Sequence, residues 1–357
     1  MMPLGYFLVY SLVSSIQGSP AQPGQWEDEY ARALDSAPAV GYANLGVGGV
    51  QFFFNGLLKT TEMAFAHNPS PSSEEMRDIK RRLSKTTYRQ LQDELGITNA
   101  IKFVIEESDT GTLKKLDCIG CKYCINSQKP HSLLIANHIF QWDFVPLLRL
   151  MDKFGVIERI SFVLASDLKN MPFFGWAMAQ NNYIFVGKNW ERDRETLRKG
   201  TNEFKYGPPG VLAIFPEGTV RSPKRAQISR DFARSNKISG FENARHVLVP
   251  KAKGLYSLLK DLDPTVDGIF DVTIAASGYC SECPKEDFSI ANLVINPEKR
   301  PKEVQVAVKF IPIEEIRGAM KSYETFKDWL LRRFVVKNEM LDRYEREGRL
   351  FERMKFI

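Results

Sequence analysis

The feature that most restricts the fold of this chain is a series of short apolar runs that begins at residue 132. Segments with the pattern of amphipathic helices separate the runs. Continuous apolar runs of this kind are typical of strands that are buried on both faces of a sheet. The runs occupy residues 132–137, 160–165, 183–186, 211–215, 246–249, 270–276 and 304–311. Their alternation with helices predicts an α/β fold with a mixed, largely parallel central sheet flanked by helices.

The first 66 residues contain two long uncharged stretches, Leu4–Ile16 and Ser36–Leu58. The first stretch is short for a membrane-spanning helix. The second has the right length, but its five glycines and its amide side chains weaken its hydropathy. We therefore expect residues 1–66 to be a helical segment that associates with a membrane, and a helical cap on the main domain is the alternative.

The remaining sequence predicts three further parts. Residues 67–129 are polar and favour a helical lead-in, whereas residues 130–312 contain the apolar runs and form the main domain. Residues 313–357 predict a C-terminal helical segment, because the charged stretch from Tyr323 onward carries an apolar stripe. The stripe consists of Trp329, Leu330, Phe334, Met340, Leu341 and Tyr344.

The formal net charge of the 357-residue chain is +6. This modest excess is typical of a solvated surface, and it also suits anionic lipid headgroups or the phosphates of coenzyme A. The net charge alone does not decide whether the protein binds nucleic acid. Because no motif of interleaved aromatic and basic residues accompanies the charge, we expect no nucleic-acid partner.

The five cysteines are unevenly spaced, as Cys118, Cys121 and Cys124 in one group and Cys280 and Cys283 in another. An odd number of cysteines favours a reducing compartment, so we expect reduced cysteines in loops. A zinc site built from Cys118, Cys121, Cys280 and Cys283 is the alternative. The two groups lie too far apart in the sequence for a compact zinc finger, so no metal is predicted.

His138 and Asp143 form the first chemical motif, directly after an apolar run. A strand there would bring His138 to its carboxyl end, where open α/β sheets bind ligands. Five residues separate the two side chains, which suits neither one face of a helix nor one face of a strand, so the chain must turn between them. Asp143 could then accept a hydrogen bond from one ring nitrogen and leave the other as a base toward a substrate hydroxyl. A structural histidine at a strand end is the alternative.

The second motif is the segment Phe215–Ser222, which follows another apolar run. Gly218 permits close approach of the backbone to a ligand, and Thr219 offers a hydroxyl donor. Arg221 could bind a phosphate with paired N–H groups. An ordinary turn with a solvated arginine is the alternative.

Two more strand ends carry cations. Lys188 follows the run at 183–186, and the segment Val249–Gly254 brings Lys251 and Lys253 after the run at 246–249. Taken singly, each of these two segments is typical of a strand end with surface lysines.

The order of these four motifs resembles that of the glycerolipid acyltransferase superfamily, the family of the 1-acylglycerol-3-phosphate acyltransferases. The resemblance covers residues 130–345 and extends beyond the motifs. The stretch MPFFGWAMAQNNYIFVGKNWERDRE resembles the segment between the first two family motifs. The stretch DWLLRRFVVKNEMLDRYEREG resembles the tail of the branch that contains lysocardiolipin and epsilon-type lysophosphatidate acyltransferases.

The resemblance implies an enzyme that transfers a fatty acyl group from acyl-CoA to the free hydroxyl of a lysophospholipid, with 1-acyl-sn-glycerol-3-phosphate as the first choice. It implies that His138 is the general base and that Asp143 orients it. It implies acyl-CoA as co-substrate, with no cofactor and no metal. The substrate-binding residues that it implies are Lys188, Glu217, Gly218, Thr219, Arg221 and Pro250.

Several positions depart from the family pattern. Asn182 and Lys188 stand where the family's motif at this place in the sequence commonly has glycine and arginine, and Val220 separates Thr219 from Arg221. These departures concern the headgroup more than the reaction. Lysocardiolipin, lysophosphatidylglycerol and lysophosphatidylinositol therefore remain alternative acceptors. A catalytically inactive lipid-binding relative is an alternative of another class.

The two substrates also predict where the protein lies. Acyl-CoA is soluble, whereas a lysophospholipid lies in a bilayer, so the active site must face a membrane. Reduced cysteines and cytosolic acyl-CoA favour the cytosolic face of the endoplasmic reticulum, and the mitochondrial outer membrane is the alternative.

Overall fold

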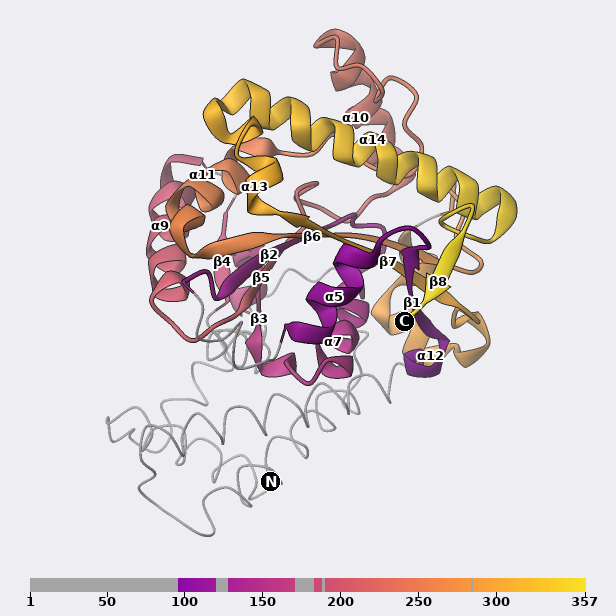
Figure 1. The fold of residues 1–357 in the computed structure, drawn as a ribbon. Coiled ribbons are helices and arrows are strands. Elements are labelled where there is room, and N and C mark those ends of the chain that lie inside the picture. The colour runs from indigo at the N-terminus through magenta and orange to yellow at the C-terminus, as the bar shows by residue number, and fades with distance from the viewer. Residues whose placement is uncertain (1–95, 120–127, 171–182, 188–189, 284) are drawn as a thin grey trace, which may run out of the picture. The chain divides into compact units, whose positions relative to one another are not determined.

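Figure 1 shows the fold of the protein in a computed structural model. The residues that the structure describes are 96–119, 128–170, 183–187, 190–283 and 285–357. Nearly all of them belong to one compact unit, which comprises Gln92–Ser166 and Asn182–Ile357. A second unit comprises Met1–Leu91 and Asp167–Asn181, of which only residues 167–170 are described.

An eight-stranded mixed sheet forms the centre of the larger unit. Its strands are β1 (Ile101–Glu106), β2 (His131–Ala136), β3 (Ile160–Ala165), β4 (Ile184–Val186), β5 (Val211–Ile214), β6 (Val266–Ala276), β7 (Val304–Pro312) and β8 (Met354–Phe356). Their spatial order is β4-β3-β5-β2-β6-β7-β1-β8. Neighbouring strands are parallel except for β6 with β7 and β1 with β8. The predicted α/β fold with a mixed, largely parallel sheet is confirmed.

Helices cover both faces of this sheet. They are α5 (Thr110–Cys118), α7 (Phe144–Lys153), α9 (Trp190–Lys205), α10 (Pro223–Ser235), α11 (Ala252–Leu262), α12 (Ile290–Ile295), α13 (Ile313–Ile316) and α14 (Tyr323–Glu347). Short 3-10 turns lie at Thr98–Ala100, Ile157–Arg159, Ser166–Asn170, Asp263–Thr265, Lys285–Phe288, Pro297–Lys299 and Ala319–Lys321. In Figure 1, α14 crosses one face of the sheet over β6, while α5 and α7 lie on the other face. Because β2 is covered on both faces, all six of its residues are buried, which explains its unbroken apolar run.

The predicted strand at residues 246–249 is wrong. The other six runs form β2 to β7, but this segment has no ladder partner among the described residues. Side chains take its amide hydrogens instead. The amide of His246 donates to Asn338 Oδ1 at 3.0 Å, that of Leu248 to Glu217 Oε2 at 2.9 Å, and that of Val249 to Ser229 Oγ at 2.8 Å. The segment is buried and apolar like a strand, yet three of its four amides are satisfied without a neighbouring strand.

Two strands lie in segments for which only helices were predicted. β1 lies within residues 67–129 and pairs in parallel with β7, with Ile101 opposite Val304. β8 lies within residues 313–357 and pairs antiparallel with β1, with Val104 opposite Phe356. β8 has only three residues, and in β1 the charged Lys102 and Glu106 leave just three consecutive apolar residues. Their local pattern is therefore too weak to predict them.

The predicted C-terminal helix is α14, and it is confirmed. Ser322 and Thr325 form a capping box at its start, and Gly348 ends it in the left-handed conformation with φ +70°. The apolar stripe packs on the sheet through Leu330, Phe334 and Leu341, which are buried.

A lysine lies in the middle of this apolar stripe. Lys337 is 1% exposed, and its ammonium group forms an ion pair with Asp271 of β6 and donates to the carbonyl of Val272. Asp271 also accepts a hydrogen bond from Arg333 Nε at 2.6 Å. Burial lowers the pKa of Lys337, and the charge of Asp271 opposes that shift. This network attaches α14 to the central strand of the sheet.

None of the helices in the described part of the chain is long and apolar enough to cross a membrane. The predicted membrane-associating segment at residues 1–66 lies outside the described residues, as does the lead-in up to residue 95.

We expect Asp271→Asn to lower the free energy of unfolding by about 3–5 kcal/mol, because it leaves the buried ammonium of Lys337 without a counter-charge. Lys337→Met should cost less, since Asp271 keeps its bond from Arg333. The double variant should recover much of the loss, and urea unfolding measures all three values. Asp328→Asn, at an exposed position of α14, is the matched control. Additive losses in the double variant would contradict the coupling.

Candidate active site

The candidate site lies at the sheet edge where the parallel strands β2, β5 and β6 all end. Asn137 follows β2 directly and pairs with Ile274 of β6 through both ends of its amide. Its Nδ2 donates to the Ile274 carbonyl at 3.0 Å, and the Ile274 amide donates to its Oδ1 at 2.8 Å. This pair of bonds fixes the point at which His138 leaves the sheet.

His138 and Asp143 form a hydrogen-bonded pair across the turn that leads from β2 to α7. His138 Nδ1 lies 3.0 Å from Asp143 Oδ2, which also accepts the amide of Phe140 at 2.9 Å. With Nδ1 donating to the carboxylate, Nε2 is the nitrogen that can accept a proton. The side chain of His138 is 19% exposed and its ring stacks on Phe215 with centroids 4.3 Å apart. The sequence prediction that the chain turns here and joins the two side chains is confirmed.

Asp143 is fully buried beneath the histidine. Burial raises the pKa of its carboxyl group, while the hydrogen bonds from His138 and from the amides of Phe140 and Ile139 oppose that shift. A carboxylate in such a place is held by the donors around it rather than by water. Its bond to Nδ1 therefore orients the ring of His138.

Glu217 is also buried, and it links His138 to the segment at 246–249. Its Oε1 accepts the amide of His138 at 2.8 Å, and its Oε2 accepts the amide of Leu248 at 2.9 Å. Burial raises the pKa of Glu217 to about 8, against the effect of these two bonds. Both carboxylate oxygens are thus bonded to main chain.

Arg221 lies beside this pair and is 3% exposed. Its amide donates to the carbonyl of His138 at 2.7 Å, so the arginine is fixed at the same turn. Among the described residues, its Nε and Nη2 have no hydrogen-bond partner. An enclosed guanidinium without acceptors is costly unless an anion completes it. The intervening Val220 therefore does not turn the arginine away from the candidate site.

The remaining predicted residues lie in the loops that follow. Gly218 has φ +70°, and a Cβ added there would lie 3.1 Å from Lys251 Nζ. The amide of Lys251 donates to the Pro216 carbonyl at 2.8 Å, which joins the second and fourth motifs. Pro250 is buried and Thr219 is half-buried.

The third motif is described only in part. β4 ends at Val186 at the same edge of the sheet, but Lys188 lies outside the described residues.

The sequence did not predict a role for Tyr279. Its ring packs against Phe140 with centroids 5.5 Å apart, and its hydroxyl is buried without a hydrogen-bond partner among the described residues. Burial raises the pKa of this hydroxyl, and the charge of Arg221 opposes that shift. Tyr279 follows the carboxyl end of β6, so the rule that ligands bind at that edge could have found it.

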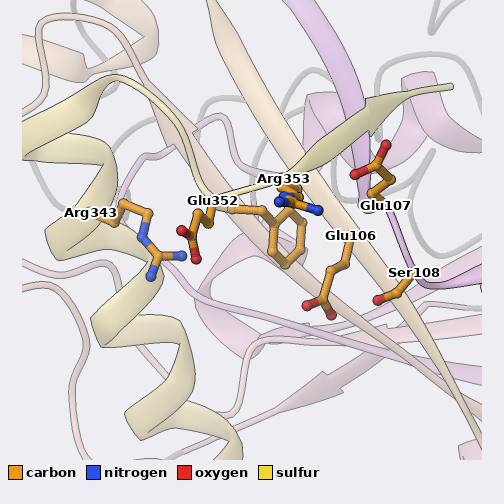
Figure 2. Close-up of a pocket in the computed structure, with 7 residues that line it drawn as sticks. Glu106, Glu107, Ser108, Arg343, Glu352 and Arg353 are labelled. Carbon is orange, nitrogen blue, oxygen red and sulfur yellow. The ribbon is translucent and has the colours of Figure 1, made fainter.

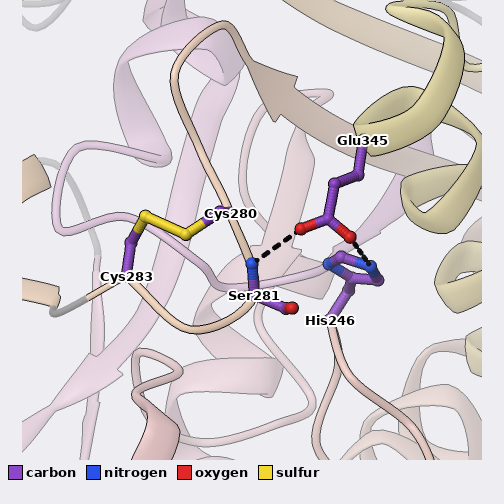
Figure 3. The surroundings of a disulfide bond; sticks show 5 residues. All are labelled: His246, Cys280, Ser281, Cys283 and Glu345. Atoms are coloured by element: carbon purple, nitrogen blue, oxygen red, sulfur yellow. Dashed lines mark hydrogen bonds and ion pairs between the residues drawn. A yellow bond between two sulfur atoms is a disulfide. The ribbon is translucent and has the colours of Figure 1, made fainter.

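The expectation of reduced cysteines is wrong for Cys280 and Cys283, which form a disulfide in the loop after β6 (Figure 3). The two residues lie close enough in a tight loop to pair, although the odd cysteine count suggested otherwise. Cys118 is a free thiol, and Cys121 and Cys124 lie outside the described residues. In this state Cys280 and Cys283 cannot serve the alternative four-cysteine zinc site.

Next to the disulfide, three side chains have the spacing of metal ligands. His246, Asp342 and Glu345 lie close together. Figure 3 shows His246 beside Glu345, whose carboxylate also accepts the amide of Ser281. Arg245 Nη2 lies 2.7 Å from Asp342 Oδ1 and 2.7 Å from Glu345 Oε2. Its guanidinium group therefore pairs with both carboxylates, and the cluster ties α14 to the loop at 245–246.

A hollow of about 460 Å³ lies elsewhere, between β1, β8 and α14 (Figure 2). β1 runs opposite to β2, so Glu106 at its end lies at the other edge of the sheet from His138. None of the motif residues lines this hollow. The lining residues are Glu106, Glu107, Ser108, Arg343, Phe351, Glu352 and Arg353.

Comparison with known proteins gives one family match and several relatives. Residues 122–277 match the family model described as Acyltransferase. The chain is 34% identical to the probable 1-acyl-sn-glycerol-3-phosphate acyltransferase 5 of Arabidopsis thaliana, over 60% of this chain and 54% of that protein. It is 25% identical to 1-acyl-sn-glycerol-3-phosphate acyltransferase 2 of Brassica oleracea, over 83% and 70%. It is 30% identical to lysocardiolipin acyltransferase 1 of Gallus gallus, over 62% and 56%. The chain thus spans little more than half the length of the first and third of these relatives.

We expect Glu217→Gln to lower the free energy of unfolding by about 1–3 kcal/mol, because glutamine offers one oxygen for two buried amides. The loss should depend on pH. With a pKa raised from 4.5 to about 8, the folded protein binds a proton that the unfolded chain releases, so wild-type stability falls as the pH rises between these values. The glutamine variant lacks this pH-dependent part of the stability. The difference in the free energy of unfolding between the two proteins should therefore narrow as the pH rises toward 8.

Urea unfolding of both proteins across this pH range measures the effect. Glu339→Gln, an exposed position on α14, is the control. A difference that stays constant with pH would show that the Glu217 carboxyl group titrates in its ordinary range.

Proposed function

We propose that this chain transfers a fatty acyl group from acyl-CoA to the free hydroxyl of a lysophospholipid, because residues 122–277 match the Acyltransferase family model and the relatives are named as 1-acyl-sn-glycerol-3-phosphate and lysocardiolipin acyltransferases. The observation that carries the proposal is the pairing of His138 with buried Asp143 beside an arginine that has unsatisfied donors. The pair supplies a base for a hydroxyl, and the arginine supplies a place for a phosphate. A lysophospholipid contains both groups close together.

In the proposed reaction, Nε2 of His138 takes the proton of the acceptor hydroxyl as its oxygen attacks the thioester carbonyl. The C–S bond then breaks, the ester forms, and the coenzyme A thiolate leaves with the proton from His138. Asp143 stabilises the imidazolium ion between these steps. The chain's other contribution is to position the two substrates, since their own groups provide the nucleophile and the leaving group.

We propose phosphate binding by Arg221 as the basis of acceptor recognition. Two of its nitrogens face no acceptor among the described residues, and a phosphate could accept from them in pairs. 1-Acyl-sn-glycerol-3-phosphate is the acceptor that we favour, because two of the relatives above are named for it. Lysocardiolipin is the second candidate, on the name of the third relative. Lysophosphatidylglycerol and lysophosphatidylinositol offer the same hydroxyl and phosphate.

A catalytically inactive lipid-binding protein is the competing function. It would have no need for a fully buried Asp143 that accepts from both His138 and the amide of Phe140. Because burial of that carboxylate is costly, its retention beneath the ring favours catalysis.

We also propose that the enzyme works at a membrane, with the site facing the cytosol and the endoplasmic reticulum as the first choice. The mitochondrial outer membrane is the alternative. The uncharged stretches at residues 1–66 support membrane association, and the physical state of the acceptor requires it.

We expect His138→Ala to abolish acyl transfer, and Asp143→Asn to lower turnover by about a hundredfold or more, because the base loses its proton acceptor or its orientation. Labelled oleoyl-CoA and a panel of lysophospholipids measure this and also identify the acceptor. The urea midpoint of each variant shows whether the fold is kept. Wild-type turnover in folded His138→Ala would exclude the mechanism.

Arg221→Ala should raise the KM for the lysophospholipid about tenfold, or roughly 1.4 kcal/mol, and leave the KM for acyl-CoA unchanged. Arg221→Lys should recover only part of the loss, because an ammonium cannot bind two phosphate oxygens in one plane. Arg332→Ala, at an exposed position of α14, is the control. If Arg221→Ala keeps wild-type acceptor kinetics, the phosphate binds elsewhere, with Lys188 and then Lys251 as the next residues to test.

A further inference from the structure

Helix α10 carries two large apolar side chains on its solvent side. Ile228 is 59% exposed and Phe232 is 52% exposed. They are one helical turn apart, so they lie next to each other on one face. The buried residues of this helix, Ala226 and Ala233, mark the side that packs on the protein. Single exposed apolar residues are ordinary, but an adjacent pair on one helix face indicates a contact surface.

Two cations extend the same face toward the start of the helix. Lys224 and Arg225 precede Ile228 by four and three residues, and both are exposed. Neither forms an ion pair with a carboxylate of the described residues. The one carboxylate on the helix, Asp231, is neutralised by Arg234 at 3.0 Å. The outward face is therefore apolar at its centre and positive at its beginning.

Arg225, although exposed, donates from Nη1 to the carbonyl of Val220 at 2.9 Å, so its side chain is held at the start of the helix. The other two arginines of α10 bind to the loop that follows the helix. Arg230 Nη1 donates to the carbonyl of Ala244 at 3.3 Å, and Arg234 Nη2 donates to the carbonyl of Glu242 at 2.8 Å. These bonds hold the inner side of the helix on the loop that leads to residues 246–249. In Figure 1, α10 projects from the unit beyond α14. The helix is thus held firmly on one side and open on the other.

The helix also begins at the candidate site. Ser222 caps it by accepting the amide of Arg225 at 3.3 Å, and Pro223 occupies its first turn. Arg221, the residue before the cap, is bonded to His138 through its amide. A surface that rests on this face would therefore lie next to the entrance of the candidate site.

We propose that the outward face of α10, formed by Lys224, Arg225, Ile228 and Phe232, docks on the surface of a bilayer that contains anionic lipid. Apolar side chains beside cations are the composition of helices that lie in the membrane interface. The positive end of the face complements anionic headgroups. A protein partner would be expected to pair with carboxylates on this face as well as with cations. The inference rests on the proposed function in one respect, which is that docking would bring the candidate site to a lipid acceptor.

Photo-crosslinking of the full chain tests the contact directly. Phe232 is replaced by p-benzoylphenylalanine, and the reconstituted protein is illuminated in phosphatidylcholine vesicles with and without phosphatidylserine. Tyr206, which is 81% exposed at the end of α9, receives the same probe as the control. α9 leads into the start of β5, so Tyr206 lies at the sheet edge opposite the candidate site.

We expect lipid adducts at position 232, more of them with phosphatidylserine, and a loss of that excess in the variant Lys224→Gln/Arg225→Gln. The probe at position 206 should give few adducts. The proposal would be overturned by equal labelling at both positions or by labelling that does not change with phosphatidylserine. A crosslink to a second copy of the chain in place of lipid would also overturn it.

An acyl-transfer assay is the second test of the proposal. Ile228→Ser/Phe232→Ser should lower acyl transfer severalfold on an acceptor embedded in vesicles and leave it unchanged on a short-chain, monomeric acceptor. Tyr206→Ser should change neither. An equal loss on both acceptors would show that α10 acts on the site itself and would overturn docking. If the wild type transfers no acyl group but position 232 still labels lipid, the proposed function fails and the docking surface remains.

Discussion

The buried carboxylate of Glu217 accepts the amides of His138 and Leu248, and these two hydrogen bonds connect segments that lie far apart in the sequence. One bond fixes the residue that follows β2. The other holds the segment at 246–249, which would otherwise need a strand partner for its amides. Because Arg221 also donates its amide to the His138 carbonyl, the loops after β2 and β5 and the segment before α11 form one connected edge. The candidate site depends on that edge being rigid.

Burial determines the electrostatics of this edge. The pKa values of Asp143 and Glu217 are both raised by burial, and hydrogen bonds from donors of the protein oppose the shift at each carboxyl group. The buried pair Asp271 and Lys337 on the face of the sheet is neutral as a whole. Arg221 differs, because its guanidinium is buried and two of its nitrogens have no acceptor among the described residues. Arg221 thus adds a buried positive charge next to the pair of His138 and Asp143.

The two edges of the sheet have different properties. The edge at which β2, β5 and β6 end carries the motif residues, the loop with the disulfide and the start of α10. The opposite edge carries the hollow beside Glu106 and the exposed Tyr206. Parallel strands with helical crossovers impose this division, because all the strand-to-helix loops lie at the carboxyl ends. If α10 rests on a bilayer, the division also orients the enzyme, with its reactive edge toward the lipid.

The sequence by itself determined the strands from β2 to β7, because strands inside a covered sheet are mostly apolar, and it determined the joining of His138 and Asp143, because their spacing requires a turn. It also placed α14, whose apolar stripe is long enough to be unambiguous. Only the tertiary structure decided whether residues 246–249 pair as a strand, because their amides are satisfied by Asn338, Glu217 and Ser229, none of which is a sequence neighbour. The same holds for β1 and β8, for the burial of Tyr279 against Phe140 and for the cysteine pair. A local pattern reports how a segment prefers to be buried, whereas hydrogen-bond partners come from distant parts of the chain and exist only once the chain has folded.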